Sequence, residues 1–98
     1  MARFRLSPKA QKDIREISDF IRRDNPVRAR SFAQELRAKI AATAQNPLLY
    51  RERAELKTGV RAVRHGQYLI LFRFDGHCLE VLTIQHGARD IGGLFEEG

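Results

Sequence analysis

Apolar residues in the first half of the chain recur with the period of an α-helix. A first helix is indicated by apolar positions spaced four, three and four residues apart: Ala10, Ile14, Ile17 and Ile21. Ser7-Pro8 is a typical helix start, with a hydroxyl that can cap and a proline at the first helical position. We expect this helix to end near Arg23, where basic residues complement the helix dipole.

A second helix follows almost at once. Its apolar side is formed by Ala29, Phe32, Ala33, Leu36, Ile40 and Ala44. Asn25 can cap this helix and Pro26 can begin it, while the proline also forces the first helix to stop. Asn46-Pro47 ends the second helix after Gln45. Two helices with so short a joint predict an antiparallel helical hairpin.

The remaining apolar positions predict strands. Phe4 and Leu6 alternate with arginines, which indicates a short, half-buried strand over residues 2–6. After a charged loop over 48–58, three further strands are expected over 60–64, 68–74 and 77–85. His65-Gly66 and Asp75-Gly76 are the turns between them, the second of a tight hairpin type. The nearly continuous apolar runs of the last two strands predict burial on both faces.

This order predicts an α+β fold. We expect a small, mainly antiparallel sheet (β-α-α-β-β-β) with the N-terminal helical hairpin packed on one face and the other face partly open. The length of 98 residues fits one domain over residues 1–98. Four glycines in residues 87–98 predict a tail that is loose or ordered by a partner, and Leu94 and Phe95 are apolar within it. Neither a signal peptide nor a membrane-spanning segment is expected.

Charge changes this picture by suggesting a partner. The net charge is +6, and most of the basic residues are arginines, which suit bidentate contacts to phosphate or carboxylate. A basic body predicts a nucleic acid or an acidic protein segment as partner, with a merely solvated surface as the alternative. The single Cys78 excludes an internal disulfide and favours a reducing cytoplasm. The three histidines lack metal-ligand spacing, so neither a metal nor another cofactor is expected.

Several segments together resemble toxins of the RelE/ParE superfamily of type II toxin–antitoxin systems. The stretch Leu6-Ser7-Pro8-Lys9-Ala10, with Asp13 and Ile17 after it, resembles the start of ParE-like toxins. The matching segments further along the chain are Asn46-Pro47, Val60-Arg61-Ala62-Val63, Tyr68-Leu69-Ile70-Leu71-Phe72-Arg73 and Ile84-Gln85-His86-Gly87-Ala88-Arg89-Asp90. They occur in the right order over nearly the whole chain.

The resemblance implies a bacterial, cytoplasmic toxin encoded beside an antitoxin. A flexible, often acidic C-terminal segment of the antitoxin would wrap this chain and silence it. ParE-like members poison DNA gyrase, whereas RelE-like members cut messenger RNA on the ribosome. Members occur as dimers and as larger toxin–antitoxin assemblies, and the sequence does not choose between these states.

The residues favour the ParE-like branch. Cleavage of RNA by its 2′-hydroxyl needs a base, an acid and cations that stabilise the charged phosphate. The candidates for such catalysis are His86, Arg61 and Arg73, but Gly87 stands where His–Tyr nucleases carry their tyrosine. We therefore expect a gyrase inhibitor that is not itself an enzyme. A ribosome-dependent mRNA endonuclease and an inactive member of the superfamily are the alternatives.

Six residues are candidates for binding the antitoxin or the target. They are Arg61, Arg64, Arg73, His86, Arg89 and Asp90. The two strand arginines, 61 and 73, are expected on the open face of the sheet, since an arginine within an apolar strand is costly unless paired or solvated. Each candidate also has a structural interpretation. The strand arginines 61 and 73 can pair with Glu80 or Asp75, and Arg64 beside the turn can be merely solvated. His86 can be a hydrogen-bonded strand end, and Arg89-Asp90 can be a local ion pair.

Overall fold

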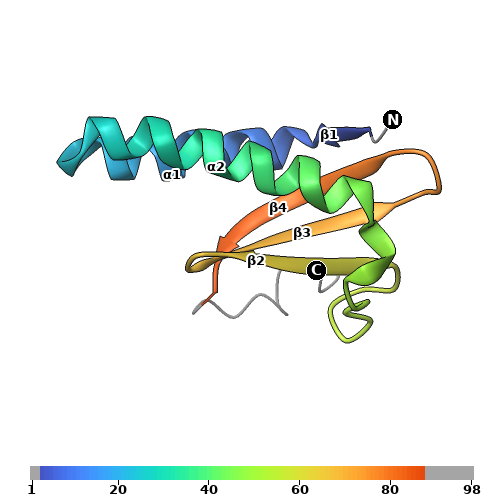
Figure 1. The fold of residues 1–98 in the computed structure, drawn as a ribbon. Coiled ribbons are helices and arrows are strands. Elements are labelled where there is room, and N and C mark those ends of the chain that lie inside the picture. The colour runs from blue at the N-terminus through green and yellow to red at the C-terminus, as the bar shows by residue number, and fades with distance from the viewer. Residues whose placement is uncertain (1–2, 88–98) are drawn as a thin grey trace.

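A computed structural model describes residues 3–87 of the chain. The described elements are, in order, β1 (Phe4–Leu6), α1 (Pro8–Asp24), α2 (Pro26–Gln45), the short 3-10 helix η1 (Pro47–Leu49), β2 (Val60–His65), β3 (Tyr68–Phe74) and β4 (Leu79–His86). The predicted order and the α+β class are confirmed, and both helices lie on one face of the sheet (Figure 1). No helix among the described residues is long and apolar enough to cross a bilayer.

Both helices begin as the sequence predicts. The Ser7 hydroxyl accepts a hydrogen bond from the Ala10 N–H at 3.0 Å, and the Asn25 side-chain oxygen accepts one from the Arg28 N–H at 3.0 Å. Each cap satisfies a backbone donor that the helix itself leaves without a partner. The expected end of the first helix near Arg23 is one residue short, since α1 runs to Asp24.

The sheet is mixed, with the strand order β1-β4-β3-β2. Strands β2, β3 and β4 form an antiparallel meander, whereas β1 lies parallel to β4, with Phe4 opposite Leu79 and Leu6 opposite Val81. The sheet is thus mainly antiparallel, as predicted, but its first strand adds a parallel edge. The described part of this strand begins at Phe4, and Ala2 lies outside the described residues.

The prediction for the last strand needs correction at both ends. The expected two-residue turn at Asp75-Gly76 is a four-residue loop, because Phe74 pairs with Leu79. The Asp75 carboxylate accepts hydrogen bonds from the N–H groups of His77 and Cys78, each at 2.9 Å, so those two residues belong to the loop. These donors, that of Cys78 first, lower the pKa of Asp75. At its other end β4 continues to His86, which pairs with Tyr68.

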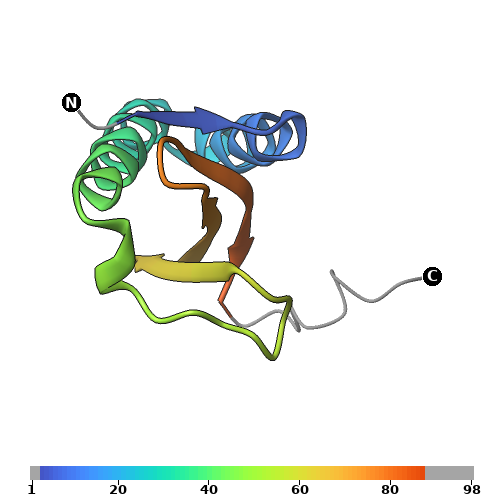
Figure 2. The same ribbon diagram turned by 90° about the vertical axis from the view of Figure 1, so that its right-hand side faces the viewer.

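The central strands are buried on both faces, as predicted. Between the helices and the sheet lies the main core, which includes Phe32, Leu36, Ile40, Ile70, Phe72, Leu79, Val81 and Ile84. A smaller cluster on the opposite face centres on Val60 and Leu71, and Leu56 packs against it. The chain between η1 and β2 crosses that opposite face (Figure 2), so the face is less open than the sequence suggests.

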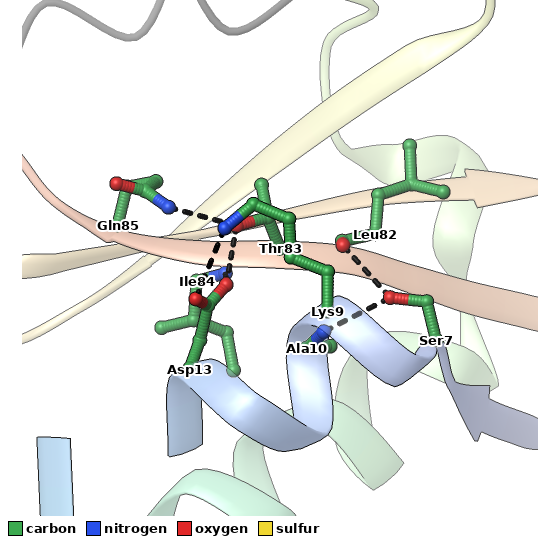
Figure 3. Close-up of polar contacts among 8 residues, drawn as sticks. All are labelled: Ser7, Lys9, Ala10, Asp13, Leu82, Thr83, Ile84 and Gln85. Carbon is green, nitrogen blue, oxygen red and sulfur yellow. Dashed lines mark hydrogen bonds and ion pairs between the residues drawn. The ribbon is translucent and has the colours of Figure 1, made fainter. Parts of the chain in front are cut away.

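A buried carboxylate ties α1 to β4. Strand β1 covers the edge of β4 only as far as Val81, so backbone groups further along that edge need other partners. Asp13, only 7% exposed, accepts hydrogen bonds from the Ile84 N–H at 3.0 Å and from the Thr83 hydroxyl (Figure 3). Its other oxygen lies 3.1 Å from the Lys9 ammonium. The start of the helix is held in the same way, because the Ser7 hydroxyl donates to the Leu82 carbonyl at 2.8 Å.

Replacement of this carboxylate should destabilise the whole domain. Asp13→Ala leaves the buried Ile84 N–H and the Thr83 hydroxyl without their acceptor, and we expect a loss of about 2–4 kcal/mol in the free energy of unfolding. Urea unfolding followed by circular dichroism measures this loss. The matched control is Asp19→Ala on the same helix, where the side chain is 66% exposed and pairs with Arg22. The control should change stability by less than about 0.5 kcal/mol. Equal effects of the two variants would contradict the anchoring role of Asp13.

Candidate functional site

Three ring side chains cross the sheet at the end where β2 turns into β3. His65 is the register partner of Tyr68, and Tyr68 is the partner of His86, so the three lie in one row across β2, β3 and β4. The Tyr68 and His86 rings meet edge to face with centroids 5.5 Å apart. Phe32 of α2 packs at 5.4 Å from Tyr68 and 5.8 Å from His65. The antiparallel register therefore builds an aromatic row that no sequence spacing shows.

Charged groups from α2 border this row. The Glu35 carboxylate accepts a hydrogen bond from Arg28 at 2.8 Å and lies 3.7 Å from the Nε2 atom of His65. The hydrogen bond from Arg28, together with the charge of that guanidinium, lowers the pKa of Glu35. His86 at the other end of the row lies 3.1 Å from the side-chain oxygen of Gln67. The row is thus bounded by polar groups at both ends.

A groove of about 220 Å³ opens where α1 passes this end of the sheet. Its helix side is formed by Glu16, Ile17 and Phe20, its sheet side by Tyr68, Ile84 and His86, and its inner end by Asp13 and Gln85. Phe20 is 62% exposed and places an aromatic side chain beside the polar groups of the groove. Such a groove can receive an apolar side chain of a partner, while the polar groups of the groove form hydrogen bonds with the polar neighbours of that side chain.

The inner end of the groove is rigid. Gln85 is 5% exposed and donates to the Thr83 hydroxyl oxygen at 2.8 Å, and Thr83 in turn donates to Asp13 (Figure 3). No buried side-chain nitrogen or oxygen among the described residues lacks a hydrogen-bond partner. A fully satisfied polar chain of this kind fixes the position of β4 against α1, and with it the position of His86.

The two strand arginines point to opposite faces of the sheet, contrary to the expectation that they share the open one. Arg61 is opposite Phe72, which lies in the main core on the helix side. The Arg61 guanidinium donates to the Tyr50 carbonyl at 2.6 Å and lies 4.0 Å from Glu52. Because successive residues of a strand alternate between faces, Arg73, next to Phe72, lies on the other side.

Arg73 belongs to a charged cross-strand row on the face away from the helices. Its register partner in β4 is Glu80, and Glu80 is also the partner of Arg5, with 3.5 Å between the guanidinium and the carboxylate of that second pair. The suggested pairing partner Glu80 is therefore opposite Arg73 in the sheet. An exposed row of this kind adds little to stability and leaves Arg73 accessible.

Arg64 lies nearer to His86 than the other strand arginines. It is exposed on β2, and its guanidinium approaches Gly87, the residue after His86, so closely that a Cβ there would meet it at 3.2 Å. Gly87 is fixed by its N–H, which donates to the Gln67 carbonyl at 2.7 Å. The remaining two candidates, Arg89 and Asp90, lie outside the described residues, as does the tail from residue 88 onward.

The geometry therefore joins only part of the predicted site. Arg64 approaches Gly87, the residue after His86, from the face away from the helices, whereas His86 shares the helix side with Tyr68. Arg61 and Arg73 also lie on different faces. Sequence reasoning missed Tyr68 and Phe20, the two aromatic residues that form the groove with His86. Tyr68 could have been found only from the strand register. Phe20 could have been noticed in the sequence, because it is an aromatic residue that lies off the apolar stripe of α1. No group of three or more metal-ligating side chains occurs among residues 3–87.

Comparisons with known proteins agree with this fold. A family model described as the ParE toxin of the type II toxin–antitoxin system parDE matches residues 4–91. A solved chain of the chromosomal ParDE system from P. aeruginosa is similar with a TM-score of 0.74 and 21% identity, over 88% of this chain and 96% of that one. A chain of the RelBE2 toxin–antitoxin complex from Mycobacterium tuberculosis has a TM-score of 0.60 and 19% identity, over 87% and 96%.

No curated protein matches the sequence. The solved structures support the α+β fold, and the family model adds a sequence match over nearly the whole length of the chain. The chain therefore belongs to the family of ParE toxins of type II toxin–antitoxin systems.

Proposed function

We propose that this toxin inhibits DNA gyrase through its surface, without a catalytic step of its own, and that a cognate antitoxin holds it inactive. The observation that carries the proposal is the separation of the candidate catalytic groups. The Arg61 guanidinium is bonded to the Tyr50 carbonyl on the helix side, and Arg73 lies on the opposite face. These cations do not converge on His86.

Convergence is what RNA cleavage requires. A base within hydrogen-bond reach of the 2′-hydroxyl, an acid at the leaving oxygen and cations at the phosphate must all act on one phosphodiester. His86 has Tyr68 and Gln67 beside it, and among the predicted arginines that the structure describes, Arg64 approaches the next residue, Gly87. Inhibition by binding has no such requirement, because an exposed and rigid surface is enough.

The groove beside His86 is the proposed docking site of the antitoxin. Phe20 offers an exposed aromatic face, and the polar chain through Asp13 holds the opposite wall in place. An amphipathic segment can place apolar side chains against Phe20 and Ile17 and polar ones near Glu16 and His86. Both solved relatives come from toxin–antitoxin systems, which supports an antitoxin as the partner.

A ribosome-dependent mRNA endonuclease is the second candidate. The contact between Tyr68 and His86 favours it, since a tyrosine beside a histidine is a plausible acid–base pair. The similarity to the RelBE2 chain concerns the fold alone. The experiments below separate the two activities.

The first test is supercoiling by purified gyrase in the presence of this protein. We expect the toxin to block supercoiling of a relaxed plasmid, and we expect equimolar antitoxin to restore it. Ribosomes programmed with messenger RNA should leave that RNA intact when the toxin is added. Normal supercoiling together with ribosome-dependent cutting would establish the endonuclease instead. An unchanged growth rate on induced expression would identify an inactive member.

The second test uses His86→Gln. If His86 does not transfer a proton, growth inhibition by the variant should stay within about 10-fold of the wild type. A general acid or base contributes about 100- to 10,000-fold to rate. A loss of that size in mRNA cleavage would therefore assign catalysis to His86 and contradict the proposal. Unfolding of the variant in urea serves as a check that the strand end is intact.

The third test concerns the antitoxin groove. Phe20→Ala should weaken binding of the cognate antitoxin about 10- to 30-fold, because an exposed aromatic residue in a groove has the character of an interface hot spot. Titration calorimetry measures the dissociation constant. Val27→Ala is the matched control, since Val27 is 79% exposed at the start of α2 and does not line the groove. Comparable losses for the two variants would place the antitoxin elsewhere.

A further inference from the structure

A second concave surface runs along the seam between the two helices. Its larger part, about 480 Å³, is lined by Ser18 and Arg22 of α1 and by residues of α2 that include Ala29, Arg30 and Arg37. It continues into a smaller hollow of about 230 Å³ that shares Ala33 and Arg37 and adds Arg15. We call the two together the arginine furrow. Its lining differs completely from that of the groove beside His86.

Four exposed arginines occupy the furrow in two rows. Arg15 and Arg22 are seven residues apart on α1, and Arg30 and Arg37 are seven apart on α2. Seven residues correspond to two helical turns, so the two arginines of each row lie about 10.5 Å apart along the helix axis. The rows lie on neighbouring antiparallel helices, whose axes pack about 8–10 Å apart.

This positive charge is largely uncompensated. Neither part of the furrow is lined by a described carboxylate. Arg22 pairs with Asp19, but among residues 3–87 no carboxylate lies within ion-pair distance of Arg15, Arg30 or Arg37. Some arginines elsewhere on the surface are paired, as in Arg28–Glu35 and Arg51–Glu55. The furrow therefore brings three arginines without a carboxylate partner, and a fourth paired only with Asp19, onto one described surface.

We propose that the arginine furrow binds the sugar–phosphate backbone of duplex DNA. Guanidinium groups bind phosphate oxygens through paired N–H donors, and two rows of them can follow two phosphate rows across a groove of the duplex. The rigid helical hairpin supplies the fixed spacing. This inference goes beyond gyrase inhibition and does not depend on it, although it would bring the toxin to the DNA on which gyrase acts.

The furrow suits a duplex better than a single strand or a peptide. Proteins that bind single-stranded nucleic acids stack the bases on aromatic side chains, and no aromatic residue lines the described furrow. An amphipathic peptide needs pockets for large apolar side chains, whereas the floor here is formed by the small residues Ala29 and Ala33. The large exposed apolar residues Phe20, Leu48 and Leu49 lie outside it.

The test is fluorescence anisotropy of the full-length protein with a labelled 20-base-pair duplex over a series of salt concentrations. Four phosphate contacts predict a slope of about −3.6 for the logarithm of affinity against that of salt. The double variant Arg30→Ala/Arg37→Ala should lower the magnitude of this slope by about 2 and weaken binding at 50 mM salt at least about 10-fold. Alanine is the best helix former, so the variant should fold, and circular dichroism verifies this.

The matched control is Arg51→Ala/Lys57→Ala, which removes the same charge from the exposed loop on the far side of the sheet (Figure 2). Its binding should stay within about 3-fold of the wild type. Equal weakening by the two double variants would overturn the proposal in favour of net charge alone. Tighter binding of a single-stranded oligonucleotide would also overturn it. Tighter binding of a polyglutamate peptide at the same ionic strength would assign the furrow to an acidic protein segment.

Discussion

The docking of α1 on the free edge of β4 is the constraint on which the rest of this molecule depends. Strand β1 is too short to satisfy the edge of β4 along its whole length. The first two turns of α1 take over, through the Ser7 hydroxyl at Leu82 and the Asp13 carboxylate at Ile84 and Thr83. A buried carboxylate is tolerable only when its oxygens are bonded in this way. The helix is thereby fixed in rotation and in height above the sheet.

That fixed helix defines the surfaces available to partners. On one side it holds Phe20 and Ile17 opposite the row of Tyr68 and His86, which creates the groove. On the other side it presents Arg15 and Arg22 to the seam with α2. The apolar groove and the arginine furrow therefore flank the same helix but offer different chemistry.

The distribution of arginines explains why a basic protein of this kind need not be a nuclease. Strand alternation sends Arg61 and Arg73 to opposite faces, and a backbone carbonyl already bonds the first. Catalysis at a phosphodiester depends on convergence within a few ångströms, whereas binding tolerates a spread of charge over a surface. Among the described residues, Arg61, Arg73 and His86 are therefore not gathered at one point.

The sequence by itself determined the element order, the helix caps and the α+β class, because helical spacing, Ser7-Pro8 and Asn25-Pro26 act over a few residues. The sequence did not reveal that Asp13 is buried, because the hydrogen bond that its carboxylate accepts comes from the N–H of Ile84, far along the chain. The faces of Arg61 and Arg73 and the meeting of Tyr68 with His86 follow from strand register. The strand register and the parallel pairing of β1 with β4 are decided by contacts between distant segments. Only the tertiary structure brings those segments together.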